Sequence, residues 1–172
     1  MMITTVTGYF RKFDLIVETE DEDFTRAKKI EFTADATSID TNSEQRDTHL
    51  RSADFFDTEK FGEIRFSGKA LERSGDDYKL TGDLTIRGVT KPIAVNVSFG
   101  GIVVDPYGQT KAGFEVTGKI SRKEFGLVWN GMTEAGQVVV SDEIRLLCEV
   151  QIIRQAVPAE ESERPRTESA YT

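Results

Sequence analysis

The side chains best suited to chemistry lie in one stretch, "QRDTHLRSADFFD" (45–57), which contains the only histidine of the chain, His49. Arg46, Asp47 and His49 together could act on a substrate, bind a polar head group or diphosphate, or hold a helix in place. Arginine suits phosphate because its planar guanidinium donates two parallel hydrogen bonds. In the structural alternative, Asp47 and His49 form a hydrogen-bonded pair that attaches the helix to neighbouring loops. We favour that alternative, because nothing in the sequence shows these groups converging on a cavity.

Aromatic residues flank this stretch and recur in "SRKEFGLVWN" (121–130). Phe55 and Phe56 would anchor the helix by burial. Phe125 and Trp129 could form the wall of a ligand site or simply close one end of the fold. Arg87 and Arg122 lie at predicted strand ends, where we expect both charges to meet water.

Motifs of enzymes and of metal sites are absent. The chain has no G-x-S-x-G, H-E-x-x-H, P-loop or dinucleotide-binding pattern. The acidic run "ETEDED" (18–23) lacks the glycine of a calcium loop and is expected to be a solvated loop. One cysteine, Cys148, excludes an intramolecular disulfide and a cysteine zinc site. We therefore expect neither catalysis nor a cofactor or metal.

Charge and hydropathy limit the partners. The net charge of −8 disfavours nucleic acid, whose binding needs clustered Lys and Arg. No stretch approaches the roughly 20 apolar residues of a membrane helix, so stable membrane insertion is not expected. The first residues, "MMITTVTGYF", do not form a secretory signal. The sequence as written predicts a cytoplasmic protein, or a periplasmic one if a preceding segment carried a signal.

Period-two alternation is the dominant pattern and predicts strands with one buried face. It runs through residues 30–36, 64–71, 78–87, 93–99, 114–120 and 144–152. The turn "RSGDD" (73–77) predicts a hairpin, "DPYG" (105–108) a type I turn, and Lys91-Pro92 a strand that begins after Lys91. The apolar faces carry Phe32, Phe66, Phe99 and Phe114, which could fill a core or line a cavity for a long apolar ligand.

One helix is predicted near residues 43–53, capped by Thr41 or Asn42, with Arg46, His49, Leu50 and Ala53 along one stripe. A single further turn is predicted at residues 121–126. The polar, proline-containing segment 155–172 is predicted to be a disordered tail. Many alternating strands and one helix leave two architectures open, a sandwich or a closed antiparallel barrel.

Four strings together are similar to the YceI-like family of lipocalin-like, polyisoprenoid-binding proteins, in order and with matching spacing. They are "FTADATSIDTNSEQRDTHLRSADFFDTEKFGEIRFSG", "LTGDLTIRGVTKPIAVNV", "ISRKEFGLVWN" and "VVVSDEIRLLCEVQII". The resemblance implies an all-β fold, a lipocalin-like eight-stranded antiparallel β-barrel around an apolar tunnel, with one short helix, over residues 1–154. Most members begin with a further strand before the equivalent of "MITTVTGYFRKF", so we expect either that the gene start was assigned too late or that the protein lacks the first barrel strand.

The resemblance implies a bacterial lipid-binding protein, not an enzyme. The expected ligand is a polyisoprenoid, an isoprenoid quinone or a fatty-acyl derivative, held in the tunnel without a cofactor. The resemblance also allows a homodimer, which unpaired edges left by a missing strand would favour. The alternative is a ligand-free structural or interaction module of the same fold, with a core filled by side chains. The residues expected at the tunnel lining or its mouth are Phe32, Arg46, Asp47, His49, Phe55, Phe56, Phe66, Phe99, Phe114, Phe125 and Trp129.

Overall fold

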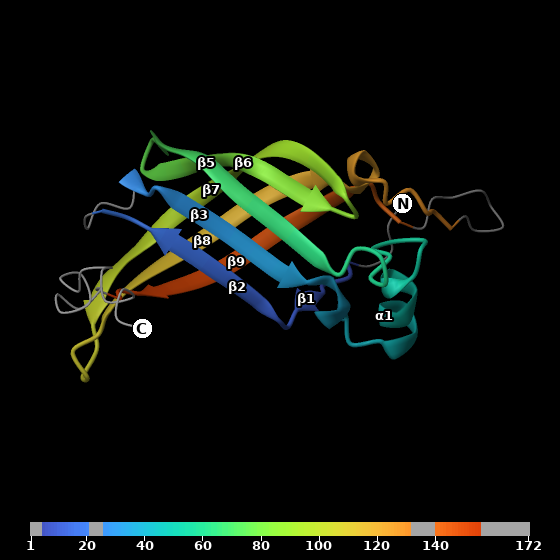
Figure 1. Cartoon of the computed structure of the whole chain (residues 1–172), viewed down its shortest axis with the longest axis horizontal. Helices are drawn as coiled ribbons and strands as arrows, with labels where there is room; N and C mark the ends of the chain where they lie inside the picture. Colours follow the sequence, from blue (N-terminus) through green and yellow to red (C-terminus); the bar gives the residue numbers. More distant parts are fainter. Residues whose placement is uncertain (1–4, 21–25, 132–139, 156–172) are drawn as a thin grey trace, which may run out of the picture.

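One seven-stranded antiparallel sheet dominates the computed structural model, which describes residues 5–20, 26–131 and 140–155 (Figure 1). Its strands follow each other in the order β2 (Phe13–Glu18), β3 (Lys29–Asp35), β5 (Glu63–Ser74), β6 (Asp77–Ile86), β7 (Val89–Val104), β8 (Thr110–Ser121) and β9 (Glu143–Ile153). A separate small pair joins β1 (Tyr9–Phe10) to β4 (Ile39–Asp40). Residues 21–23 of the expected acidic loop (18–23) and residues 156–172 of the expected tail (155–172) lie outside the described residues.

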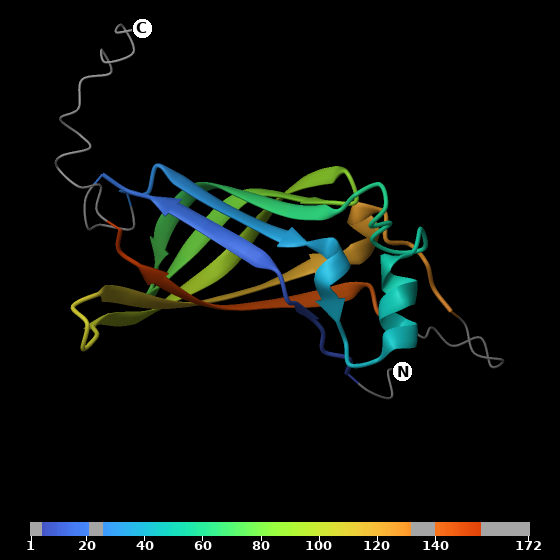
Figure 2. The same cartoon turned by 60° about the horizontal axis from the view of Figure 1, so that its bottom comes forward.

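The sheet curls into a half-barrel (Figure 2), which confirms the barrel-type expectation over the sandwich. Its register places the apolar row of each strand on the same concave side, here called the inner face. Phe66 of β5, for example, lies between Phe32 of β3 and Leu84 of β6. Because neighbouring residues on one strand point to opposite sides, the predicted alternation is what gives the sheet one apolar face.

The two outer strands, β2 and β9, are each paired on one side only within the described chain. β2 pairs with β3, and β9 pairs with β8 over its whole length. Since every pairing in the sheet is antiparallel and the strands are seven in number, β2 and β9 run in the same direction. They therefore cannot close the barrel by an antiparallel ladder of their own.

The predicted hairpin at 73–77 and a turn at 105–108 are present, the latter closed by a hydrogen bond from the Gly108 N–H to the Asp105 carbonyl. Gly75, in the left-handed region at φ 64°, lies in the turn between β5 and β6, and Asp105 accepts hydrogen bonds from the backbone of Tyr107 and Gln109 at the next hairpin. The predicted start of β7 was wrong, because the strand begins at Val89 and contains Pro92. Proline is tolerated there because β7 pairs with β8 only from Asn96 onward, so no ladder hydrogen bond on that side needs its missing N–H.

The helix is shorter than predicted. α1 spans Glu44–Arg51 instead of 43–53, and its N-cap is Ser43, whose hydroxyl accepts from the Arg46 N–H. Asn42 cannot take the capping role because its φ of 61° is left-handed. The predicted stripe was also wrong, since Arg46 is exposed and Asp47 is the residue of α1 that is buried.

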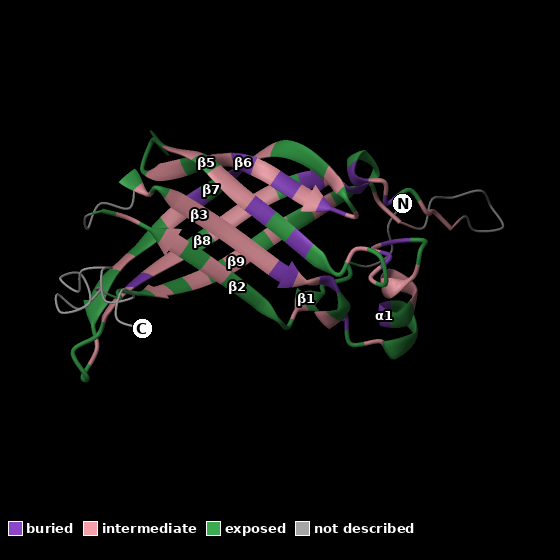
Figure 3. Cartoon of the chain, in the orientation of Figure 1, coloured by how far each residue is buried: buried purple, intermediate pink, exposed green. Residues whose placement is uncertain are grey.

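Most of the buried side chains lie in the half of the molecule nearest α1 (Figure 3). There the inner face packs against two short 3₁₀ turns, η2 (Ala36–Ser38) and η3 (Arg122–Phe125), and against residues that follow α1 and η3. The η3 turn confirms the turn predicted at 121–126. In the described part of the chain, none of the helices has the length and apolar character to span a bilayer.

Candidate functional site

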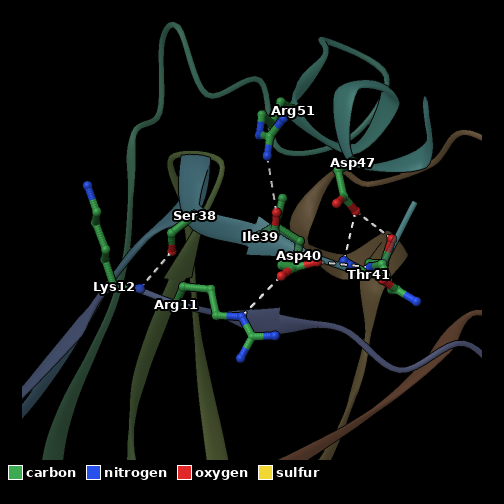
Figure 4. Close-up of polar contacts among 9 residues, drawn as sticks. Arg11, Lys12, Ser38, Ile39, Asp40, Thr41, Asp47 and Arg51 are labelled. Carbon is green, nitrogen blue, oxygen red and sulfur yellow. Dashed lines mark hydrogen bonds and ion pairs between the residues drawn. The ribbon is translucent and has the colours of Figure 1, made fainter. Parts of the chain in front are cut away.

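The α1 end of the sheet contains most of the residues that the sequence singles out. Asp47 is buried, and its Oδ1 accepts from both the N–H (2.9 Å) and the hydroxyl of Thr41 (Figure 4). Arg51 donates from Nε to the Thr37 carbonyl and from Nη2 to that of Ile39. These bonds tie α1 to the η2–β4 segment. Asp47 is therefore a structural acceptor in the described contacts.

Asp40 extends the same network to β1. Its Oδ1 accepts from the Asn42 N–H, and its Oδ2 accepts from Arg11 Nε at 3.1 Å. The Asn42 backbone bond, followed by the Arg11 side chain, lowers the pKa of this carboxyl below its ordinary value. Asp40 is therefore ionised at neutral pH and holds the turn before α1 against the small β1–β4 pair.

Arg46 contacts the same loop. Its Nε donates to the Thr41 hydroxyl at 2.8 Å and its Nη2 to the Thr41 carbonyl at 2.6 Å. The side chain is exposed, and two of its five N–H groups are already used by the protein. This arrangement accounts for Arg46 without a ligand.

His49 and Asp47 do not form the predicted hydrogen-bonded pair. His49 Nε2 lies 2.9 Å from Asp54 Oδ2, while Asp47 bonds Thr41. The prediction failed because residues two apart on a helix point in different directions. The His49 ring also packs edge-on against Phe55 and Trp129, at centroid distances of 5.1 and 4.7 Å.

Five aromatic side chains pack at this end of the half-barrel: Phe10, Phe55, Phe56, Phe125 and Trp129. Phe55 and Trp129 contact each other at 5.4 Å, and Phe56 packs edge-on against Phe10 at 5.7 Å. Phe125 is completely buried. We call the cluster of His49, Phe55, Phe125 and Trp129 the plug. His49 and Phe55 come from α1 and the residues that follow it, and Phe125 and Trp129 come from η3 and the residues that follow it. The two segments lie about 70 residues apart in the sequence and meet at this end of the sheet.

Arg122 contradicts the expectation that it would meet water. It is 2% exposed, and its guanidinium donates to the carbonyls of Ser141 (2.8 Å) and Trp129 (2.7 Å), and also to those of Leu127 and Val140. No carboxylate bonds it in the described contacts. Backbone carbonyls replace its hydration shell, so one cation fixes the segment after η3 against the segment before β9.

Arg87 departs from the same expectation only in part, because it is half-buried and two backbone carbonyls accept from its guanidinium. From the turn after β6 it donates to the carbonyls of Phe55 and Gly126, both at 3.2 Å. It thus links both halves of the plug to the sheet. The structural role of both arginines was not predicted, because the carbonyls that they bond belong to segments that only the completed fold brings close.

Asp142 supports the Arg122 segment from outside. Its Oδ2 accepts from the Ser121 hydroxyl at 2.7 Å and its Oδ1 from the Lys123 N–H. These bonds, with the Ser121 hydroxyl first, lower its pKa below the ordinary value of 3.8. A lowered folded-state pKa stabilises the fold at higher pH, and this contribution is lost as the pH falls below that value.

The other four expected site residues lie on the sheet. Phe66 is buried, and Phe32 is half-buried with its ring 6.0 Å from that of Phe13. Phe99 and Phe114 form a second aromatic pair, 5.2 Å apart, at the end of the sheet far from α1. The structure therefore brings the candidates together in three groups rather than one.

The inner face at the far end is only partly covered. Phe99 is 40% exposed, and Phe114, Val116 and Val150 are half-buried. Cys148 faces the same side, and burial raises the pKa of its thiol, which disfavours the reactive thiolate. Within the described ranges, no three His, Cys, Asp or Glu residues are placed to hold a metal ion. In the part of the chain that the structure describes, the inner face offers apolar contact.

Comparison with known proteins gives consistent matches. The YceI-like domain model matches residues 1–152. Protein YceI of Escherichia coli is 40% identical over 148 residues, covering 86% of this chain and 74% of that protein, and protein YceI of Salmonella arizonae is 38% identical with the same coverage. A crystal structure of the Campylobacter jejuni YceI protein superposes with a TM-score of 0.78 at 30% identity, over 91% of this chain and 89% of that one. Burkholderia cenocepacia BcnA, at 21% identity and a TM-score of 0.71 over 84% of this chain and 86% of that one, shares the fold.

Replacing Arg122 with methionine should destabilise the protein strongly. Arg122→Met keeps much of the apolar stem but leaves buried carbonyls without donors, which should cost about 3 kcal/mol of unfolding free energy. Arg65→Met, which removes an exposed guanidinium paired with Glu63, is the control and should change stability by less than about 0.5 kcal/mol. Urea melts of both variants measure the difference, and equal losses would contradict the role assigned to Arg122.

Replacing His49 with alanine should lower stability more than ligand affinity, because its ring packs on Phe55 and Trp129. We expect His49→Ala to cost about 1–2 kcal/mol from the lost ring contacts. Gln45→Ala, on the exposed side of the same helix, should be neutral. Thermal melts run beside lipid titrations give both quantities. Unchanged melting with lost binding would instead favour a head-group role for His49.

Proposed function

The chain belongs to the YceI-like family, and on that premise we propose that it binds a long apolar chain along the inner face of the half-barrel. The ligand class is a polyisoprenoid, an isoprenoid quinone or a fatty-acyl derivative. The observation that carries the proposal is an apolar inner face that its own side chains leave partly exposed. On β9, all five inner residues, Ile144, Leu146, Cys148, Val150 and Ile152, are only half-buried.

The unequal cover of the two ends supports one orientation of the ligand. The plug packs tightly at the α1 end, with Phe125 fully buried. The far end, with Phe99 and Phe114, is more exposed. We therefore propose that the apolar chain enters at the Phe99–Phe114 end and that its tip stops against Phe55 and Trp129. Head-group contact with Arg46, Asp47 and His49 stays a separate prediction, and their bonds to Thr41 and Asp54 supply a structural reason for these residues.

Burial of the ligand would provide the affinity. Each methylene removed from water contributes about 0.8 kcal/mol. A chain of some tens of carbons would nominally exceed the practical ceiling of about 18–21 kcal/mol, so part of that free energy goes into ordering the chain. Affinity should therefore rise with chain length until the inner face is covered, and should depend weakly on the head group.

A second candidate function is a ligand-free structural or interaction module, and one observation favours it. Two inward glycines are already covered by neighbouring side chains: a Cβ on Gly82 would lie 2.6 Å from Phe66 Cζ, and one on Gly118 would lie 2.8 Å from Val95 Cγ1. Side chains thus fill part of the space over these positions. Organic extraction of the purified protein followed by mass spectrometry separates the two functions. A stoichiometric lipid supports the first function, and an empty extract supports the second.

The chain-length dependence tests the binding function directly. Ligands with one head group and increasing acyl length should bind progressively more tightly, with Trp129 emission as the readout. Val116→Asn, on the inner face of β8, should weaken binding of the longest ligand about tenfold because a buried amide loses its water. Thr117→Asn, its outward neighbour, is the matched control and should leave affinity unchanged. Equal affinity for short and long chains would contradict the proposal.

A further inference from the structure

The hairpin between β7 and β8 projects from the sheet at the end far from α1, as Figure 1 and Figure 2 both show. β6 pairs with β7 only as far as Val97, so among the described residues 98–104 pair with β8 alone. A bulge between Phe99 and Gly101 marks the point of departure, and Gly101 has a φ of 109°, which glycine adopts readily. We call residues 101–111 the arm.

Large apolar side chains are exposed on both faces of the arm. Ile102, Val103 and Val104 are 55%, 59% and 67% exposed, and Tyr107 in the turn is 91% exposed. Ile102 and Val104 lie on the same side as the inner face, whereas Val103 between them points to the outside. Exposed apolar residues that gather in one place mark an interaction site more often than scattered ones do.

The arm carries no net charge. Its sequence, "GIVVDPYGQTK", has two charged side chains, and these pair with each other, with Lys111 Nζ 3.1 Å from Asp105 Oδ2. Both side chains are half-buried. The Gln109 N–H, followed by the Lys111 side chain, lowers the pKa of the Asp105 carboxyl below its ordinary value. The carboxylate therefore stays ionised at neutral pH, and the pair remains neutral as a whole.

We propose that the arm docks on the surface of a lipid bilayer without net charge, and that the apolar ligand passes along it to the inner face. The docking needs no ligand, whereas the passage of the ligand rests on the proposed function. The contact is a reversible one at the level of the head groups, made by the tip of one hairpin.

The two-sided exposure favours lipid over a second protein. The groove of a protein would cover one face of the arm, and a second arm laid against it would do the same. Lipid surrounds a projecting hairpin, so that Val103 on one face and Val104 on the other leave water together. Tyr107 suits the interface because tyrosine places an apolar ring among acyl chains and its hydroxyl among head groups.

The apolar side of the arm is continuous with the inner face. Ile102 lies opposite Ala112, and the next inner residue of β8 is Phe114, whose ring is 5.2 Å from that of Phe99. A long apolar chain that leaves the bilayer along Ile102 would therefore stay in apolar contact until it reaches the Phe99–Phe114 pair. This is the end of the half-barrel at which we propose that the ligand enters.

The charge of the rest of the protein selects the kind of bilayer. The chain has a net charge of −8, and Glu115 and Glu149 lie directly opposite each other on the outer face, next to Ser98 at the base of the arm. An anionic surface would repel this region. Zwitterionic head groups bring no such cost, and they match an arm whose own charges cancel.

Vesicle partition of the full chain tests the docking. The protein should co-sediment with vesicles of dioleoylphosphatidylcholine, and added phosphatidylglycerol should reduce the bound fraction. V103D should lower the partition coefficient about tenfold, because it gives the arm a net charge. V128D is the matched control and should change partition little, since Val128 is a similarly exposed valine (62%) that follows η3. Both variants change the net charge of the protein equally.

A tryptophan on the arm reports whether its tip enters the lipid. The W129F background keeps an aromatic ring in the plug, and Y107W then places the single tryptophan in the turn of the arm. Its emission should shift to shorter wavelength with phosphatidylcholine vesicles and should be quenched when their acyl chains are brominated. V128W in the same background is the control and should show neither effect.

Four results would overturn the docking: no partition, equal partition of V103D and V128D, quenching of both reporters, or binding to anionic vesicles only. Loss of an oligomer by V103D, with vesicle binding unchanged, would also overturn it and assign the arm to a second copy. Titration with dodecanoate in the absence of vesicles separates the docking from the proposed function. Unchanged dodecanoate affinity of V103D with lost partition supports the docking. Intact docking without any dodecanoate binding supports the docking as well, and counts against the proposed function alone.

Discussion

An antiparallel sheet with one apolar face has to cover that face, and this requirement organises the whole molecule. Period-two alternation places the apolar rows of seven strands on one side. Curling brings the rows toward one another, but a curled sheet stays open at its two ends and along the seam between its outer strands. The segments outside the sheet, α1, η2 and η3, pack at one of these open ends. Among the described residues, the plug covers one end, and the end with Phe99 and Phe114 stays partly exposed.

Covering the α1 end with loops creates a polar problem that the two arginines solve. Residues 126–131 and 140–142, like the residues that follow α1, belong to no strand, so their carbonyls lack ladder partners. Buried carbonyls without donors are costly. Arg122 and Arg87 supply several donors each at the points where these segments meet. The aromatic plug and the two arginines therefore depend on each other. Phe125 can be buried because Arg87 and Arg122 donate hydrogen bonds to the backbone carbonyls around it.

Local chemistry in the sequence was enough to predict strands, hairpin turns, the turn at η3 and the family. These rest on patterns that a few neighbouring residues determine, such as the alternation in β9 or the Asp105–Gly108 turn. The partner of His49 and the burial of Arg122 were not predictable in this way. His49 bonds Asp54 because the chain turns back after α1, and Arg122 meets carbonyls from segments brought together only by the completed sheet. The N-cap of α1 was predicted wrongly for a smaller reason. Thr41, Asn42 and Ser43 all have side chains that can cap a helix, and the left-handed φ of Asn42 leaves this role to Ser43, the next residue.

Strand β9 belongs to the ladder with β8 and also to the inner face, so the same residues serve sheet pairing and the proposed ligand contact. Leu146, Cys148 and Val150 belong to the edge strand and also to the apolar row that a ligand would contact. Pairing with β8 fixes the backbone of β9 and leaves these side chains pointing into the half-barrel, since successive side chains of a strand point to opposite faces of the sheet. A ligand on the inner face would therefore contact side chains of β9 without competing for the backbone hydrogen bonds between β9 and β8.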